Sequence, residues 1–289
     1  MSEAGPFASQ TGKSPSEKKR VTLRDVAEEA GVSLKTASNV INHTGRMTDA
    51  TREKVQKVVD RLGYRVNVSA RNLNRGRTGF ITLAVPCLTA PYLAELANRV
   101  IDAARIYGYS VYVTTYAEGT SHGVTSLLRN FNSTISDGMI LSLSEMEDLT
   151  PEDLSVDYPL VCVGARFTHY KADHVTPDDV QSARLATEYL LDRGVSRPAV
   201  VGSRTDFAQL STLRDVTEGN AQLRMRGVFE ACCDRNIALA TELMPNVGHD
   251  WSIGSGARNM QRIIDSGVPF DGVIALNDQL AMGALSTLA

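Results

Sequence analysis

A short segment near the N-terminus carries side chains suited to contacting DNA. Residues 33–39 read SLKTASN, and the exposed positions that follow Ser33 are Leu34, Lys35, Thr36, Ser38 and Asn39. Lysine and asparagine bind base edges in the major groove, whereas serine and threonine hydroxyls reach phosphates. The segment therefore predicts a helix that contacts DNA through its N-terminal half.

Two short helices are expected to hold this segment in place. Thr22 predicts the start of the first helix, with Asp25 as its capping-box partner, and Gly31 predicts its end because glycine adopts the left-handed conformation at little cost. Ser33 begins the second helix, Leu34–Asn42. A helix, a tight turn and a second helix form a helix-turn-helix, although a plain helical hairpin would show the same features.

The sequence also predicts a third helix and shows an uneven distribution of charge. Apolar residues recur at helical spacing between the capping Thr48 and the terminating Gly63. Residues 1–78 contain 15 lysines and arginines against 8 aspartates and glutamates, whereas the remaining residues contain 15 against 25. A basic N-terminal part favours contact with phosphates, and a solvated surface with accidental asymmetry is the alternative.

Beyond residue 79 the sequence alternates between apolar strands and amphipathic helices. This alternation predicts two doubly wound lobes of parallel sheet, with a ligand cleft at the carboxyl ends of the strands. The expected strands are Phe80–Pro86, Tyr109–Tyr116, Asp137–Leu143, Tyr158–Gly164, Arg197–Gly202, Ala238–Pro245 and Phe270–Asn277. The expected helices are Tyr92–Tyr107, Gly119–Phe131, Asp178–Gly194, Gly219–Asn236, Ser255–Gly267 and a last one from Asp278.

The composition points away from membrane, secreted and metal-binding proteins. The chain has no apolar run of membrane-spanning length and no apolar signal segment, so we expect a cytoplasmic, nucleoid-associated protein. Its cysteines lack the spacing of a zinc site or a disulfide framework and are expected to be buried thiols: Cys87, Cys162, Cys232 and Cys233. Phosphate-loop, nucleophile-elbow and zinc-protease motifs are missing from the sequence, so neither a cofactor nor an enzymatic activity is expected.

Ordered sequence blocks resemble the LacI family of transcription regulators. The family's DNA-binding head and hinge are matched by VTLRDVAEEAGVSLKTASNVIN, TREKVQKVVDRLGYRVN and SARNLNRGRTGFITLAVP, and its core by blocks such as LRMRGVFEA and DGVIALNDQLAMGAL. The resemblance covers residues 21–289. It implies a helix-turn-helix domain over 21–66, a hinge helix and linker over 67–78, and an effector-binding, dimerising core over 79–289, after a polar extension, 1–20, that is expected to be disordered.

The resemblance implies roles for residues of the head and hinge. Leu34, Lys35 and Asn39 match positions that read the operator in the major groove. Leu73 matches the hinge leucine that wedges between base pairs in the minor groove, and Arg71 is expected to follow the phosphates. The expected DNA-binding set is completed by the hydroxyl-bearing residues Thr22, Ser33, Thr36 and Ser38.

In the core the resemblance implies a site for a small-molecule effector, commonly a sugar. Arg224 and Asp278 match effector-binding positions, and a guanidinium with a carboxylate suits the hydroxyls of a polyol. Trp251, the single tryptophan, matches an aromatic residue that lies against the ligand, Tyr92 is expected to form a pocket wall, and Asp178 is a further candidate. The structural alternatives are a surface arginine at 224, a core tryptophan at 251 and a helix cap at 278.

The sequence thus predicts an all-α helix-turn-helix head and an α/β core of two doubly wound parallel-sheet lobes that resembles periplasmic binding proteins. The expected function is that of a homodimeric repressor that binds double-stranded operator DNA under the control of a sugar-like effector. The chain ends inside the last expected helix, so the second lobe is expected to be incomplete. The alternatives are a regulator without effector response and a small-molecule-binding protein without DNA function, which would need an export signal and no head.

Overall fold

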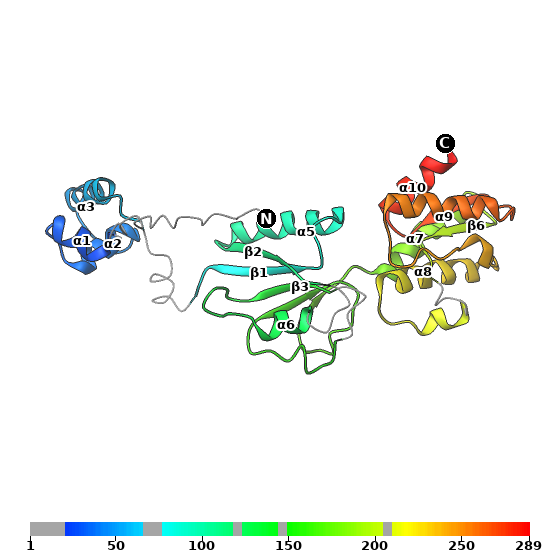
Figure 1. The fold of residues 1–289 in the computed structure, drawn as a ribbon, viewed down its shortest axis with the longest axis horizontal. Coiled ribbons are helices and arrows are strands. Elements are labelled where there is room, and N and C mark those ends of the chain that lie inside the picture. The colour runs from blue at the N-terminus through cyan, green and yellow to red at the C-terminus, as the bar shows by residue number, and fades with distance from the viewer. Residues whose placement is uncertain (1–20, 66–76, 118–122, 144–148, 205–209) are drawn as a thin grey trace, which may run out of the picture. The chain divides into compact units, whose positions relative to one another are not determined.

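The chain forms two compact units, Met1–Gly76 and Arg77–Ala289 (Figure 1). The computed structural model describes residues 21–65, 77–117, 123–143, 149–204 and 210–289. The expected N-terminal extension and the hinge residues Arg71 and Leu73 lie outside these described residues.

The N-terminal unit is a bundle of three helices. They are α1 Leu23–Glu29, α2 Leu34–Ile41 and α3 Asp49–Leu62. Their inner faces meet in a small core of Val26, Ala30, Val40, Val55 and Val58. The apolar residues that recur at helical spacing in the sequence therefore line the centre of this bundle.

The predicted caps fix the ends of these helices. The side chain of Thr22 accepts a hydrogen bond from the N–H of Asp25, and the Asp25 carboxylate accepts the N–H of Thr22 in return, at 2.8 Å. Ser33 and Thr48 cap α2 and α3 in the same way. Gly63 ends α3 in the left-handed region with φ of 62°. The capping residues thus set the positions of α2 and α3.

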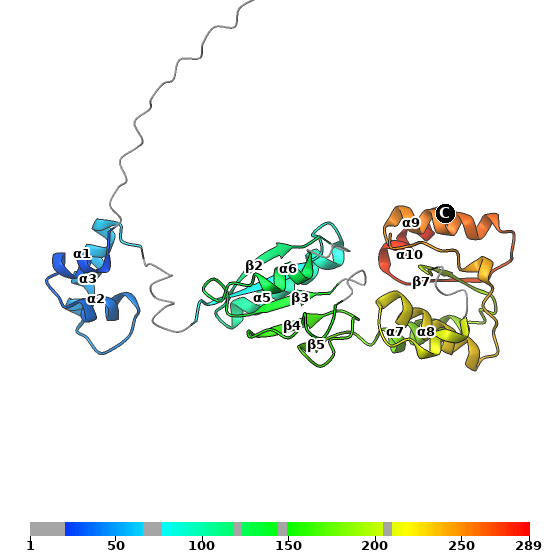
Figure 2. The same cartoon turned by 60° about the horizontal axis from the view of Figure 1, so that its bottom comes forward.

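The first lobe of the second unit contains five parallel strands in the order β2-β1-β3-β4-β5. The strands are β1 Phe80–Val85, β2 Ser110–Thr115, β3 Met139–Ser142, β4 Leu160–Val163 and β5 Asp173–Val175. Helix α5 (Pro91–Ile106) lies on one face, where Leu83 and Val85 are buried, and α6 (Val124–Arg129) lies on the other, beside the core that includes Ala84 (Figures 1 and 2). Alternate residues of β1 therefore enter different cores.

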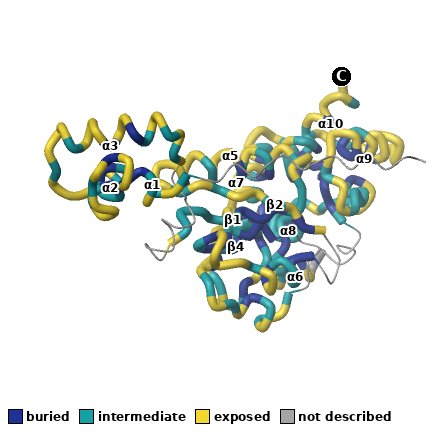
Figure 3. The backbone as a smooth tube through the Cα atoms, turned by 60° about the vertical axis from the view of Figure 1, so that its left-hand side comes forward, coloured by how far each residue is buried: buried dark blue, intermediate teal, exposed yellow. Residues whose placement is uncertain are grey.

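The second lobe is built around two parallel strands, β6 Pro198–Val201 and β7 Gly272–Ala275. Two helices cover each face of this pair (Figure 2). Val200 packs with α7 (Asp179–Leu191) and α8 (Asn220–Asp234), whereas Ala199 and Val201 pack with α9 (Ile253–Asp265) and α10 (Asp278–Leu288). Figure 3 shows buried residues concentrated along the strands and the inner sides of the helices.

The strands differ from the prediction at two places: one expected strand is missing and one observed strand was not expected. The expected strand Ala238–Pro245 is wrong, because this segment contains the 3₁₀ helix η3, Thr241–Leu243, whose N–H groups bond within the turn. Leu243 is buried against β6, so burial rather than sheet pairing accounts for the apolar pattern. The strand β5 was not predicted, because all three of its residues are exposed and give no alternating pattern.

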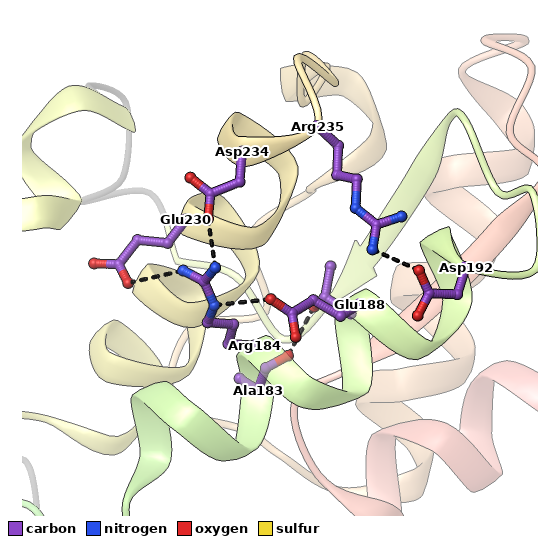
Figure 4. Close-up of polar contacts among 8 residues, drawn as sticks. Ala183, Arg184, Glu188, Asp192, Glu230, Asp234 and Arg235 are labelled. Carbon is purple, nitrogen blue, oxygen red and sulfur yellow. Dashed lines mark hydrogen bonds and ion pairs between the residues drawn. The ribbon is translucent and has the colours of Figure 1, made fainter.

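Helices α7 and α8 approach each other closely at Gly227. A Cβ atom at this position would lie 2.2 Å from the carbonyl oxygen of Val180 on α7. On the outer side of the same contact, Arg184 of α7 binds Glu188 and also Glu230 and Asp234 of α8, as Figure 4 shows. The absence of a side chain at Gly227 allows the two helices to approach closely, and the ion pairs of Arg184 hold them together.

Replacing Gly227 by alanine should destabilise the second unit. The added methyl group meets backbone atoms, so the helices must separate, at a cost of about 1–3 kcal/mol or more. The matched control is Gly254→Ala on α9, where the new Cβ meets no backbone and lies near only the side-chain ends of Arg258 and Ser252, at 3.3 and 3.9 Å. Alanine is also the better helix former. Urea unfolding followed by circular dichroism measures both; equal midpoints for the two variants would contradict the close contact.

Candidate DNA-binding and effector sites

The outer face of α2 presents the residues expected to read bases. Ala37 and Val40 are buried against the other helices of the head. Lys35 and Asn39 are four residues apart and lie on the opposite side of α2, as its helical periodicity requires. Leu34 precedes them in the first turn, with 48% of its surface exposed. The structure therefore brings Leu34, Lys35 and Asn39 to an accessible surface of one helix.

The hydroxyl-bearing candidates are engaged in local hydrogen bonds. The hydroxyls of Ser33 and Thr36 lie 2.8 Å apart, and the hydroxyl of Thr22 donates to Asp25 at 2.9 Å. The hydroxyl of Ser38 accepts a bond from the Asn42 side chain at 3.2 Å. These residues therefore fix the backbone of α1 and α2, and Thr22, which caps α1, lies outside the reading helix.

The loop after α2 carries an exposed arginine that was not among the predicted DNA-binding residues. Arg46 is exposed in this loop, which begins at His43 with φ of 51° and turns at Gly45 with φ of 78°. A Cβ atom at Gly45 would lie 2.9 Å from the side-chain nitrogen of Asn39, so the loop packs against the reading helix. A basic residue in the turn directly after the helix-turn-helix was the available signal.

In the second lobe, a buried carboxylate holds the candidate Arg224. Asp179 is 3% exposed and accepts the Nε–H of Arg224 at 2.7 Å and the side-chain N–H of Asn220 at 2.9 Å. The Nη1 atom of Arg224 donates to the carbonyl oxygen of Leu276, just after β7, at 2.6 Å. Arg224 is therefore a half-buried, fixed side chain, and the alternative of a surface arginine is wrong. Asp179 was missed, because its neighbour Asp178 was chosen.

Trp251 lies beside this arginine. The centre of its ring is 5.6 Å from the guanidinium carbon of Arg224, within the range of a cation–π contact. Its carbonyl oxygen accepts the side-chain N–H of Asn277 at 3.3 Å, which links it to the end of β7. The indole N–H is buried and has no acceptor among the described residues. Part of the ring packs against apolar cores, so the core alternative for Trp251 agrees with the structure, and Trp251 also lies beside the candidate site residue Arg224.

The remaining candidates lie at the ends of strands or helices. Asp278 is exposed in the first turn of α10, but the cap of that helix is Asn277, which accepts the N–H of Leu280 at 2.8 Å, so the capping alternative for Asp278 is wrong. Asp178 caps α7 by accepting the N–H of Gln181 at 2.9 Å. Tyr92 is exposed at the start of α5, in the first lobe.

A cavity in the first lobe lies apart from the polar cluster around Arg224. An open cavity of about 510 Å³ lies in the first lobe between α6 and the sheet, and it is lined by none of the predicted effector residues.

Two of the four cysteines are buried thiols, as expected. Burial raises the pKa of the Cys162 thiol to about 12 and that of the Cys232 thiol to about 11. Cys87 and Cys233 are only half-buried, contrary to expectation. Within the described ranges, no cluster of His, Cys, Asp or Glu suits a metal ion, and no helix is long and apolar enough to cross a bilayer.

A helical head with an exposed reading helix, followed by a core with a polar cluster at the ends of parallel strands, defines a DNA-binding regulator with a ligand-binding domain. Residues 22–67 match the model of bacterial regulatory proteins of the lacI family, and residues 78–289 match that of the periplasmic binding proteins and sugar binding domain of the LacI family. The chain belongs to the LacI family of transcriptional regulators, and the predicted fold class is confirmed.

Individual relatives agree with this assignment. The chain is 28% identical over 264 residues to the ribose operon repressor of Halalkalibacterium halodurans, covering 91% of this chain and 74% of that protein. A LacI-family regulator from Sanguibacter keddieii is 34% identical in structure-based comparison, with a TM-score of 0.61 over 74% of this chain and 72% of the other. The lac repressor dimer bound to operator, at 23% identity, shares the fold with a TM-score of 0.77 over 93% and 78%.

Removing the Asp179 carboxylate should destabilise the second lobe. Asp179→Ala leaves the half-buried Arg224 without its partner, at a cost of about 2–4 kcal/mol. The control is the double variant Asp179→Ala/Arg224→Leu, which removes both charges and should recover part of the loss. Because Trp251 is the only tryptophan, urea unfolding followed by its emission reports on this lobe. If Asp179→Ala unfolded at the wild-type urea concentration, the pair would not hold the site.

Proposed function

We propose that this regulator represses transcription by reading its operator with α2, and that a sugar-like effector bound beside Arg224 controls this binding. The observation that carries the proposal is the fixed arrangement of Arg224 between Asp179, Leu276 and Trp251. Such an arrangement offers hydrogen-bond donors and an aromatic face in one place. The sugar-binding domain that residues 78–289 match supports the same class of ligand.

The chemistry of the cluster favours an uncharged polyol. Asp179 neutralises Arg224, so the guanidinium contributes donors without net positive charge. The exposed carboxylate of Asp278 can accept hydrogen bonds from the hydroxyl groups of a ligand and would repel a phosphate group. The flat face of Trp251, which lies beside Arg224, suits the C–H face of a sugar ring. Asp178 and Tyr92 are proposed as peripheral contacts to the effector. Asp178 already caps α7, and Tyr92 lies at the start of α5 in the first lobe.

On the DNA side, Lys35 and Asn39 are proposed as the base-reading residues, with Leu34 as an apolar contact. Lys35 and Asn39 lie on the side of α2 opposite its buried residues, and Leu34 is exposed in the first turn of the helix. The hydroxyl groups of the capping and first-turn residues are proposed to donate hydrogen bonds to phosphates; these residues are Ser33, Thr36, Ser38 and Thr22. The hydroxyl of Thr22 must turn away from Asp25 to do so. Arg71 and Leu73, outside the described residues, are proposed as the phosphate contact and the minor-groove wedge.

Homodimerisation is proposed because one head contacts too few bases for high specificity. Exposed apolar side chains support it. They lie on α10, on β2 and at the end of α5, and they include Met282, Leu285, Tyr112, Ile106 and Tyr107. These side chains are available for burial against a second copy of the chain. The proposed setting is the cytoplasm, at the nucleoid, and no catalytic role is proposed.

Lys35→Ala should change the sequence preference of the protein. Removing a base-edge contact should weaken binding to the preferred duplex by about 1–3 kcal/mol and leave binding to random duplex almost unchanged. The control is Lys57→Ala, which removes the same charge from the exposed side of α3. Selection from a randomised duplex library, followed by fluorescence anisotropy, measures both variants. Equal losses on preferred and random duplexes for Lys35→Ala would remove Lys35 from the reading set.

Arg224→Ala should weaken effector binding. The ligand is first found by thermal-shift screening of pentoses, hexoses, disaccharides, sugar phosphates and nucleosides, in which uncharged sugars are expected to score. The active compound is then titrated against Trp251 fluorescence. Arg224→Ala and Asp278→Asn should each lose about 1–3 kcal/mol of binding, because hydroxyl groups of the bound ligand lose a charged hydrogen-bond partner. Arg99→Ala and Asp265→Asn are exposed controls. Wild-type affinity in both site variants would overturn the assignment.

A further inference from the structure

The two lobes share a carboxylate clasp at the amino ends of their strands. In the first lobe, Asp137 accepts the backbone N–H of Thr78 at 2.6 Å and that of Gly79 at 2.9 Å, immediately before β1. In the second lobe, Asp271 accepts the N–H groups of Ser196 and Arg197 at 2.9 and 2.7 Å, immediately before β6. Each aspartate precedes a glycine and a neighbouring strand, so the two clasps have the same form.

The two clasps differ in what they hold. Residues 196 and 197 connect α7 to β6 inside the second unit. Residues 78 and 79 are instead among the first residues of that unit, which begins at Arg77, and the segment before them leads to the DNA-binding head. The Thr78 side chain adds a bond from the N–H of Phe80 at 3.1 Å. The first clasp therefore anchors the point where the chain leaves the core towards the head.

We propose that Asp137 is a positioning residue for DNA binding: by clasping Thr78 and Gly79 it fixes the point at which the linker leaves the core, and thereby the spacing between the two heads of a dimer. The inference rests on the proposed dimeric operator binding. Asp137 would therefore affect the distance between the two half-sites of the operator, whereas α2 would determine which half-site sequence is recognised.

The physical basis is the length of free chain on each side of the dimer. Without the clasp, the chain is next held at the carbonyl oxygen of Gly79, which accepts the N–H of Ser110 at 2.9 Å. Residues 78 and 79 are then free up to that bond, and each adds about 3.3–3.6 Å of reach, so each head gains roughly 7 Å. One base pair advances about 3.4 Å along the duplex, so this slack spans about two base pairs. A longer tether also lowers the effective concentration of the second head once the first has bound. Loss of the clasp should therefore broaden the accepted spacing and weaken the best site.

The clasp is expected to be intact at neutral pH. Burial of Asp137 disfavours its charge, but the bonds from Thr78 and Gly79 and the charge of Arg77 outweigh burial and lower its pKa. Bonds from Ser196 and Arg197 likewise lower the pKa of Asp271. Asparagine in either position keeps the size of the side chain, but it turns an amide donor towards one of the two N–H groups.

The test compares Asp137→Asn with Asp271→Asn in the full chain. The probe is the duplex that the wild-type chain selects from a randomised library, prepared with the spacing between half-sites unchanged and changed by about one, two or three base pairs. Fluorescence anisotropy gives the affinity for each duplex. Hydrogen exchange of the peptides containing residues 78–80 and 196–198 reports whether each clasp is broken. Urea unfolding gives the stability of both variants.

For the wild type, affinity should fall about ten-fold or more when the spacing changes by two base pairs. Asp137→Asn should reduce this penalty to about three-fold or less, lower the affinity for the best spacing, and select the same half-site sequence as the wild type. Asp271→Asn should lose comparable stability but keep the wild-type dependence on spacing.

A wild-type dependence on spacing in Asp137→Asn, with exchange showing the clasp broken, would overturn the proposal, and so would equal broadening in both variants. If the wild type selected only single half-sites and bound them as a monomer, the dimeric operator binding itself would fail, together with the role of Asp137. If Asp137→Asn does not fold, Asp137→Ser, which keeps one acceptor for the two N–H groups, takes its place with the same expected results.

Discussion

The buried carboxylate of Asp179 is the constraint on which the effector region depends. A carboxylate that is 3% exposed requires a partner, because an isolated buried charge is costly. Arg224 and Asn220 of α8 supply that partner, and Arg224 then reaches the carbonyl oxygen of Leu276 after β7. One ion pair therefore fixes the start of α7, the first turns of α8 and the end of β7 against each other.

Local signals were sufficient for the head and for most of the core. Thr22, Ser33 and Thr48 each cap the helix that the sequence predicted, because a cap depends only on residues three positions away. The alternating strands and helices also emerged from periodicity alone. The segment 238–245 failed because burial of Leu243 gives the same apolar pattern whether the backbone pairs in a sheet or turns in a 3₁₀ helix.

The candidate site was only partly predictable, for a different reason. Arg224 and Asp179 are 45 residues apart, so no local pattern indicates which of the adjacent Asp178 and Asp179 is buried. The structure separates their roles, since Asp178 caps α7 at the surface and Asp179 holds the arginine. The resemblance to the family supplied positions such as Arg224 and Trp251, but the orientation of the guanidinium follows from contacts that only the fold creates.

The same division between local and distant contacts bears on how the protein is controlled. In the head, the contacts of the small helical core and of the Glu29–Arg61 ion pair all lie within residues 21–64, so contacts inside the head shape the surface of α2. Under the proposed function, base recognition by Lys35 and Asn39 therefore follows from the head itself. A ligand at the proposed site beside Arg224 would then act on how the two heads of the proposed dimer are presented, through the chain that joins each head to the effector-binding unit. The bonds that Asp137 makes to Thr78 and Gly79 lie at the beginning of that route. The proposed function thus assigns sequence recognition to contacts inside the head, and its control to the route that begins at this clasp.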